Sequence, residues 1–490
     1  MSVATRTKGR STIDRRYNCT RRPEVDGYRE ISAKRSFARN RKAFPSETHS
    51  HPTGSGKVEA KKELGSGSGL FTRRGMNTTS TTKPKLFSTL GQLCKLIPVH
   101  LVAKLARETG VKDKARAFTP WSHVVSLLYA QLAHALSLND VCDALSFVTG
   151  RLQAIRGAKA PSRNGFSHAN RTRDPELARR LFWATLEHLQ TLAPGFGRRP
   201  QRRYGFRFKR LIHLVDSTTL TLVANCIDWA RHRRRKAAAK CHVRLDWGSL
   251  LPRFVVVASA GEGDDGARTP ELCAAVKPGE IVVFDKAYVV FLHLFALHAR
   301  GIVWVTRAKE KMRYRVIESR PASGKIVRDE LVELTLWKTH RAYPEPLRRV
   351  VARVEVDGVE KEMAFLTNQL DWAASSVADL YRCRWQVEVF FKQIKQTLQL
   401  ADFLGHNENA VRWQIWTALL LYVLLRFIAG VHRWAGSFSR LFTLLRATLW
   451  LPKDLATLLE RYGTADGKKR RMCAHPESAF LPGMLHVMTP

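Results

Sequence analysis

The chain has 490 residues, of which 44% are hydrophobic and 25% charged. That is enough for two to four globular domains with a large core. Its 82 Lys and Arg residues outnumber 42 Asp and Glu residues, which gives a formal net charge of +40. Such a charge favours a polyanionic partner, and nucleic acid is the leading candidate. A membrane-surface role is disfavoured because no basic amphipathic helix or lipidation signal accompanies the charge.

The cysteines and the apolar runs indicate a cytoplasmic, nucleoid-associated protein. None of the eight cysteines forms a Cys-x-x-Cys pair, so we interpret them as buried thiols and not as disulfides or zinc ligands. The N-terminus is basic but has no apolar run typical of a secretion signal. The most apolar run, Ile415–Leu425, is too short to span a bilayer, so we predict a buried helix there.

Residues 1–75 differ in composition from the rest. They are rich in Lys and Arg, poor in aliphatic residues, and include the Gly/Ser stretch Gly65–Gly69. We predict a disordered basic extension. Met76, followed by a polar stretch, favours the hypothesis that the native chain starts there.

Residues 76–200 are predicted to form a helical N-terminal domain. The apolar spacing is helical in Leu86–Pro98, Trp121–Leu136 and Pro175–Leu192. We interpret Pro161–Arg171 as a polar, cation-bearing loop between helices. A small basic helical domain suits DNA binding, but a packing domain with a basic surface has the same pattern.

Residues 201–309 and 364–430 are predicted to form an α/β catalytic core with a mixed sheet. Two apolar runs end on an aspartate: Leu211–Val215 before Asp216, and Ile281–Phe284 before Asp285. Further strands are expected at Lys240–Asp246, Phe254–Ala258, Ile302–Val305 and Phe365–Asn368, with a helix at Val289–Arg300. The basic run Arg231–Lys236 is either a solvated surface or a phosphate contact.

Two further regions complete the predicted organisation. Residues 310–363 alternate polar and apolar residues in Tyr314–Ile317, Leu331–Leu336 and Arg349–Val356. This pattern predicts an antiparallel β insertion in the core. Residues 431–490 are predicted to be a helical C-terminal region with a polar tail.

The stretch Tyr381–Lys395 predicts a helix with two distinct faces. At 100° per residue, Tyr381, Arg384, Glu388, Lys392 and Lys395 fall within roughly an 80° arc. The other face is apolar: Leu380, Cys383, Val387, Phe390, Phe391, Ile394 and Leu398. The polar face is either a solvated row of i,i+4 ion pairs or part of a site, in which its cations would neutralise phosphates.

Three carboxylates could converge at the carboxyl ends of the strands: Asp216, Asp285 and Glu388. Ligands bind at that edge in open α/β sheets. Three such acids could hold two Mg²⁺ ions about 3.5–4 Å apart, for in-line attack on a phosphodiester. Each aspartate could instead cap a turn or a helix, and rival carboxylates lie nearby at Asp228, Asp246, Asp264 and Asp265.

The motifs resemble those of a known family. Tyr381-x₂-Arg384-x₃-Glu388-x₆-Lys395 matches the Y-R-E-K signature of the insertion-sequence-four family of DDE transposases. Asp216-Ser-Thr resembles its first aspartate motif, and Asp285-Lys-Ala-Tyr288 resembles its second, with Ala287 where glycine is commoner. Ser167-His-Ala-Asn170 is similar to part of its leading helical domain.

The resemblance implies a ribonuclease-H-like core interrupted by a β domain. Asp216, Asp285 and Glu388 would be the metal ligands for two Mg²⁺ ions, with Mn²⁺ as a substitute. Tyr381, Arg384 and Lys395 would contact phosphate near the cleaved end. For Trp385 two interpretations stay open: stacking on DNA bases near a hairpin, or packing in the core.

The implied function is cut-and-paste transposition. The protein would bind terminal inverted repeats, hydrolyse the transposon end through a hairpin, and transfer the strand to target DNA as a homodimer on double-stranded DNA. Two alternatives stay open: a catalytically silent or repurposed DNA-binding protein, and a ribonuclease-H-like nuclease that does not transpose.

Overall fold

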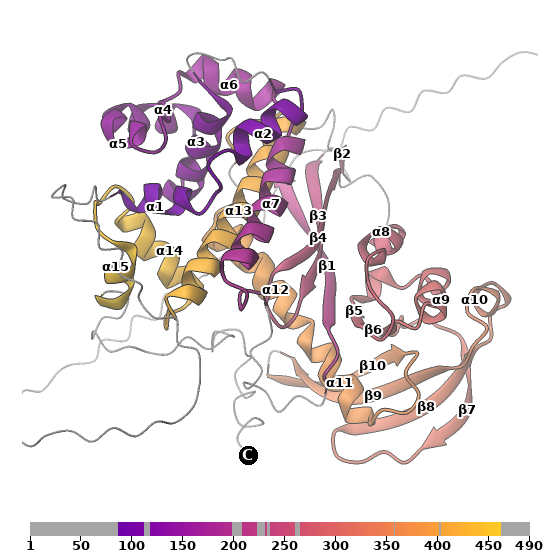
Figure 1. Ribbon diagram of the computed structural model, residues 1–490. Helices are drawn as coiled ribbons and strands as arrows, with labels where there is room; N and C mark the ends of the chain where they lie inside the picture. The colour runs from indigo at the N-terminus through magenta and orange to yellow at the C-terminus, as the bar shows by residue number, and fades with distance from the viewer. Residues whose placement is uncertain are drawn as a thin grey trace, which may run out of the picture. The chain divides into compact units, whose positions relative to one another are not determined.

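The computed structural model describes residues 87–111, 118–197, 208–222, 231–232, 236–259, 265–356, 358–400 and 403–461. The predicted disordered segment 1–75, the C-terminal tail and the side chains of the basic run Arg231–Lys236 lie outside the described residues. Within the described part of the chain, a mixed sheet of ten strands is covered by helices on both faces (Figure 1).

The region before the sheet is helical, as predicted. Four of its helices begin where a hydroxyl side chain, that of Ser88, Thr119, Ser137 or Ser162, accepts a backbone N–H. The helices are α1 (Thr89–Lys95), α2 (Leu101–Glu108), α3 (Pro120–Ala133), α4 (Leu138–Phe147), α5 (Thr149–Gln153), α6 (Arg163–Thr172) and α7 (Glu176–Leu192).

The prediction of a loop at Pro161–Arg171 is wrong, because α6 occupies most of it. This helix has few aliphatic residues, so its period is hard to detect in the sequence. It buries Phe166, Ala169 and Asn170, and the Asn170 side chain is hydrogen-bonded to the buried His123 ring at 2.8 Å. One aromatic and one amide anchor the helix where an apolar stripe would normally do so.

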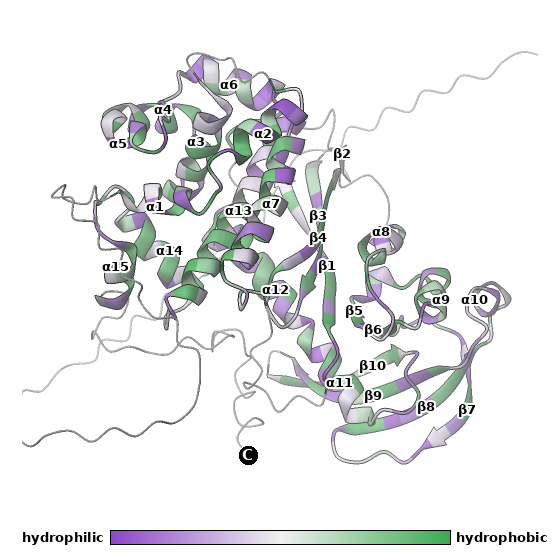
Figure 2. Cartoon of the chain, viewed as in Figure 1, coloured by the Kyte–Doolittle hydropathy of each residue, from purple (hydrophilic) through white to green (hydrophobic). Residues whose placement is uncertain are grey.

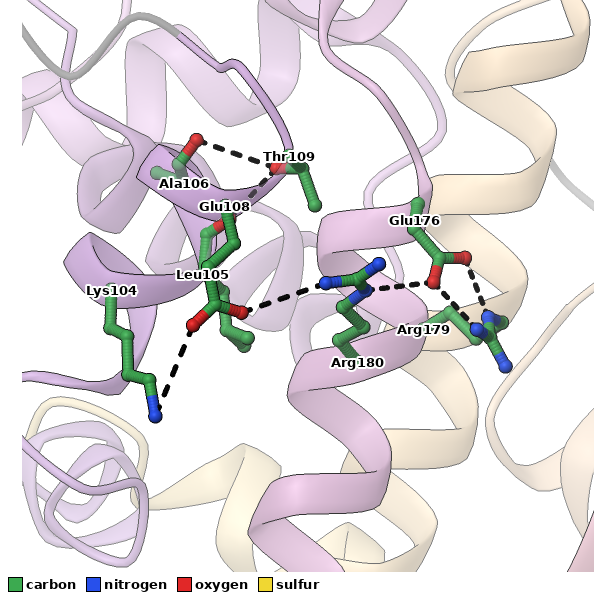
Figure 3. Close-up of polar contacts among 8 residues, drawn as sticks. All are labelled: Lys104, Leu105, Ala106, Glu108, Thr109, Glu176, Arg179 and Arg180. Atoms are coloured by element: carbon green, nitrogen blue, oxygen red, sulfur yellow. Dashed lines mark hydrogen bonds and ion pairs between the residues drawn. The ribbon is translucent and has the colours of Figure 1, made fainter.

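A chain of surface ion pairs joins α2 to α7 (Figure 3). Glu108 lies between Lys104 and Arg180, at 3.9 and 3.6 Å, and Glu176 accepts from Arg180 and Arg179 at 2.9 and 2.6 Å. Exposed pairs contribute roughly 0–1 kcal/mol each. These pairs also neutralise the cations of this face, which makes it a weaker candidate for contact with DNA phosphates.

The first six strands form the core of the sheet. They are β1 (Ile212–Leu222), β2 (Arg231–His232), β3 (Lys236–Asp246), β4 (Pro252–Ser259), β5 (Ile281–Phe284) and β6 (Val303–Arg307). In the order β4–β3–β1–β5–β6, β1, β5 and β6 are parallel and β3 is antiparallel to its neighbours. These five strands have the order and the directions of a ribonuclease-H-like sheet, as predicted for the core.

The sheet continues through the predicted β insertion. The strands β7 (Tyr314–Arg320), β8 (Ile326–Leu334), β9 (Leu347–Val356) and β10 (Val359–Thr367) are antiparallel, with α10 (Trp337–Ala342) between β8 and β9. Because β10 pairs with β6, the insertion extends the main sheet. A buried ion pair, Arg348 with Asp329 at 2.7 Å, fixes β9 against β8.

Helices cover both faces of the core strands. The helices α8 (Thr269–Cys273) and α9 (Phe291–Ala299) contribute to one apolar cluster with Val215, Val282 and Phe284. On the opposite face lie α11 (Ala374–Cys383), α12 (Trp385–Lys392) and the π-helical η5 (Gln393–Thr397). Every residue of the predicted apolar stripe from Leu380 to Leu398 is buried, as expected.

The C-terminal helices share the core of the N-terminal ones. They are α13 (Glu408–Val431), α14 (Phe438–Ala447) and α15 (Leu455–Arg461), and α13 contacts α3, α6 and α7. One apolar cluster extends from Leu90 to Leu459, so the predicted domain boundaries stay predictions.

Helix α13 is longer than the apolar run predicted. Its 24 residues are long and apolar enough to cross a membrane, and it is strongly hydrophobic along its length (Figure 2). However, 83% of its most apolar window is buried inside the protein. We therefore interpret α13 as a core helix, as the sequence indicated for Ile415–Leu425.

His123 makes the stability of the helical region depend on pH. Its ring is buried, lies 4.5 Å from the Trp413 ring, and has its pKa lowered to about 3, first by burial and then by the Arg173 charge. Below about pH 6.5, His123 is therefore protonated in the unfolded chain but stays neutral in the folded protein. This contribution to stability is present above pH 6.5 and is lost as the pH falls.

We expect His123→Gln to flatten the pH dependence of thermal unfolding between pH 6.5 and 4. The wild-type protein should lose up to about 1.4 kcal/mol per pH unit more than the variant over this range. The measurement is the unfolding midpoint of both proteins at several pH values. Parallel curves would show that His123 does not carry the effect.

Candidate active site

The register of the sheet places Asp216 beside Asp285. Strands β1 and β5 are parallel, with Val215 opposite Phe284, so the next residue on each chain is an aspartate. Both aspartates lie on the face covered by α12, since side chains alternate along a strand. The prediction that β1 ends at Asp216 is wrong: the strand continues to Leu222. Asp285 does follow the end of β5, where it also accepts the Ala287 N–H at 3.2 Å.

Helix α12 adds the third carboxylate to this face. Arg384, at the start of α12, donates to Asp216 at 2.8 Å and also ion-pairs with Glu388 one turn along the helix. The Arg384 side chain is 16% exposed, so this face of the helix is not a solvated row of surface pairs. Arg384 instead links two acids that are far apart in the sequence.

The predicted continuous helix is interrupted at two places. At Arg384 the hydrogen bonds tighten, because its N–H bonds to Tyr381 and its carbonyl accepts from Val387. After Lys392 the helix widens into the π-helical η5, closed by a bond from Leu398 to Gln393. The uniform angle of 100° per residue therefore does not extend to Lys395. Such local changes of helix type are frequent at functional sites.

Burial and neighbouring charges favour a proton or a cation on Asp216. The pKa of Asp216 is raised to about 6, first by burial and also by the charges of Asp285 and Glu388, while the charge of Arg384 and the Ser217 N–H oppose the rise. Burial lowers the pKa of Arg384, but the charges of Tyr381 and of the three acids raise it more, so its pKa lies above the usual range and the side chain stays charged. Three carboxylates within electrostatic reach of each other need a counter-cation, and in this structure Arg384 supplies it.

The rival carboxylates either lie elsewhere or have other partners. Asp246 is buried in a turn, where it accepts the Gly248 N–H at 2.8 Å and pairs with Arg253. Asp265 contacts Ser217 and Lys240 at 2.9 and 2.6 Å. Because Ser217 follows Asp216 on β1, it points to the opposite face of the sheet. Asp228 and Asp264 lie outside the described residues.

The remaining predicted site residues surround the acids unequally. Tyr381 is half-buried, packs on the Phe365 ring at 4.8 Å, and lies under the Arg384 guanidinium. Trp385 is 40% exposed, so the alternative of a core aromatic is wrong. Lys392 is exposed and Lys395 partly so.

One residue of the site was not predicted from the sequence. Arg307 follows Thr306, which pairs with Phe284 across the parallel strands β5 and β6. Asp216, Asp285 and Arg307 therefore occupy equivalent positions on three adjacent strands, and Arg307 lies close enough to affect the pKa of Tyr381. The carboxyl end of the third parallel strand was a sufficient signal to find it.

The three carboxylates suit a hard divalent cation, but the side chains around them must move before an ion can bind. Asp216, Asp285 and Glu388 offer carboxylate oxygens, which Mg²⁺ and Mn²⁺ prefer. Among the described residues, no three acidic, His or Cys side chains are close enough to hold an ion as they stand. The guanidinium of Arg384 pairs with two of the three acids, so it must withdraw before they can bind a metal.

Arg384 is expected to stabilise the metal-free protein by compensating these acids. Arg384→Met should lower the melting temperature in EDTA, since removing one partner of a buried pair costs up to about 3–5 kcal/mol, less here because Glu388 is 35% exposed. Added Mg²⁺ should reduce the difference in melting temperature between Arg384→Met and the wild-type protein. Arg412→Met, which removes a surface pair with Glu408, is the matched control, and equal losses in both variants would contradict the role of Arg384.

Comparisons with known proteins identify the family. A model of the transposase DDE domain matches residues 207–424, and a domain of unknown function matches residues 87–156. A Sinorhizobium fredii protein, y4zB, described as a transposase, is 31% identical over 288 residues, which cover 58% of this chain and 78% of that one.

A second relative is more distant, and one solved structure is similar at low sequence identity. The transposase described for insertion sequence element IS5377 of Geobacillus stearothermophilus is 27% identical over 71% of this chain and 85% of its own. A solved piggyBac transposase synaptic complex with hairpin DNA covers 74% of this chain and 80% of its own, with 12% identity and a TM-score of 0.40. The family model and the two sequence relatives, together with the order of the acids on the sheet, lead to one conclusion: the chain belongs to the DDE transposases of insertion sequences.

Proposed function

We propose that this transposase cuts and joins DNA with Asp216, Asp285 and Glu388 as its metal ligands. The observation that supports this most strongly is the register of β1 and β5, which sets two aspartates side by side under the helix that carries Glu388. When bound, two Mg²⁺ ions would activate the attacking oxygen and stabilise the leaving one. Mn²⁺ would substitute for Mg²⁺.

The cations around the acids would bind the DNA strand being cut. Once released from Asp216, the Arg384 guanidinium can donate hydrogen bonds to a phosphate group instead of the carboxylate. Guanidinium groups bind carboxylate and phosphate in the same bidentate way. Arg307, Lys392 and Lys395 would add positive charge, and Tyr381 would contact phosphate near the cleaved end. Trp385, exposed beside Arg384, would stack on a base unpaired by hairpin formation.

The wider reaction is cut-and-paste transposition. The protein would recognise terminal inverted repeats, open the end through a hairpin, and join it to target DNA. Two ends must be held together for this, so we propose a homodimer on double-stranded DNA in the cytoplasm, at the nucleoid. Residues 76–200 would contribute to end binding.

A catalytically silent DNA-binding protein is the main alternative, and a nuclease that does not transpose is the second. The presence of all three carboxylates, two of them in register on one sheet face, favours an active enzyme. Mg²⁺-dependent nicking of a transposon end would exclude the catalytically silent DNA-binding protein. Strand transfer from a free 3′-hydroxyl end would exclude the nuclease that does not transpose.

Single substitutions of the three acids should separate catalysis from binding. Asp216→Ala, Asp285→Ala and Glu388→Ala should each abolish end cleavage, because each removes oxygen ligands, while end binding stays largely intact. Glu187→Gln, at an exposed position of α7, should cleave like the wild type. Cleavage by any of the three alanine variants would refute the assignment.

Lys395 should matter more for the hairpin than for overall binding. Lys395→Ala is expected to reduce hairpin formation clearly more than it reduces affinity for the uncut end, because the contact would form near the distorted phosphate. Hairpin yield on a gel is compared with binding by mobility shift. Equal losses in both assays would rule out a phosphate clamp.

A further inference from the structure

A groove of about 390 Å³ lies beside the candidate active site, on the next turns of the same helix. One wall is formed by Lys392, at the end of α12, together with Gln393 and Thr397 of η5. Residues along α14, from Phe438 to Arg446, form the opposite wall, and His134, at the end of α3, closes one side. Lys392 is one turn beyond Glu388, so the groove continues from the site of the three acids.

The groove has the chemistry of a phosphate-binding surface. Lys392 and Arg446 are exposed cations, and Ser439 and Thr443 add exposed hydroxyl groups. Within the described part of the chain, none of the residues that line the groove is acidic. Cations alternating with hydroxyl groups, without a competing carboxylate, match the nucleic-acid backbone better than they match a base or an apolar ligand.

The cation on the α14 wall is held in position by neighbouring elements. Arg446 donates to Nδ1 of His134 at 2.9 Å, and Nε2 of His134 lies 3.1 Å from the Thr397 carbonyl oxygen. The His134 ring stacks on Phe442, with 4.9 Å between centroids. This chain of contacts describes a neutral His134 that donates to the backbone and accepts from Arg446. The contact with His134 thus positions the Arg446 guanidinium without a carboxylate partner from the residues that the structure describes.

Further hydrogen bonds connect the groove to α12 and η5. Gln131 of α3 donates to the Leu398 carbonyl just after η5, and Thr397 hydrogen-bonds to Ser439 at 3.0 Å. The widened turn is thus fixed against both α3 and α14. A ligand across the groove would contact an element continuous with Glu388.

We infer that this groove, bounded by α3, α12–η5 and α14, binds the phosphodiester backbone of the DNA strand next to the cleaved position. The inference rests on the proposed function and deepens it. It assigns a second row of phosphate contacts, with Arg446 and the hydroxyl groups of α14, outside the Y-R-E-K residues. The Ser439 hydroxyl group, which can accept from Thr397, would donate to a phosphate oxygen between the two cations, and the Thr443 hydroxyl group would do so on leaving the Ser439 carbonyl oxygen.

Salt-dependent binding of a fluorescein-labelled DNA duplex of arbitrary sequence tests this. Removing one cation that neutralises a phosphate lowers the slope of log affinity against log salt by about 0.9. Arg446→Ala should lower the slope by about this amount, Arg446→Lys should keep most of it, and Ser439→Glu should weaken binding several-fold at every salt concentration. Lys338→Ala, which removes an exposed cation on α10, should leave affinity and slope unchanged.

The outcomes separate this inference from the proposed function. If the wild-type protein does not bind the duplex, both the groove inference and the proposed function are contradicted. Salt-dependent wild-type binding that is unaffected by Arg446→Ala and Ser439→Glu would overturn the groove alone, and so would an equal reduction in Lys338→Ala. Unchanged DNA affinity in Ser439→Glu, together with reduced affinity for a poly-glutamate peptide, would assign the groove to an acidic protein segment. Thermal melting of each variant confirms that it is folded.

Discussion

The candidate site depends on the compensation of three carboxylates by one guanidinium. Asp216, Asp285 and Glu388 come from two strands and a helix, and burying them together without a cation would be strongly unfavourable. Arg384 resolves this by bonding to Asp216 and Glu388 at once. The protein can therefore fold with its acids assembled before any metal binds. If the three acids bind metal ions, as we propose, Arg384 has to withdraw from Asp216 and Glu388 first.

The rest of the fold maintains this geometry. The parallel register of β1, β5 and β6 brings Asp216, Asp285 and Arg307 to one edge, and the apolar stripe of α11–α12 fixes the helix over it. The antiparallel strands β7–β10 extend the sheet beyond β6. The α13 helix, almost wholly buried, joins the N-terminal and C-terminal helices behind α12. The groove beside η5 lies where these parts meet.

Much of this could be predicted from the sequence, for physical reasons that also explain the failures. Period-two runs and apolar runs ending in aspartate identified the core strands, and helical spacing identified the buried stripe from Leu380 to Leu398. The polar helix α6 was missed because Phe166 and Asn170 anchor it without an aliphatic stripe. The extension of β1 past Asp216 was missed because Ser217–Thr221 is mostly polar, and its pairing with β3 is a tertiary contact that the local sequence pattern does not show. Arg384 was predicted to contact phosphate, but its bond to Asp216 spans 168 residues, and no local pattern encodes it.

The most direct test of the central claim is an anomalous diffraction map from crystals grown with Mn²⁺. The account predicts a manganese peak enclosed by carboxylate oxygens of Asp216, Asp285 and Glu388, with the Arg384 side chain turned away from Asp216. A peak bound by other residues would contradict it. So would a metal-free site in which Arg384 still joins the two acids at saturating Mn²⁺.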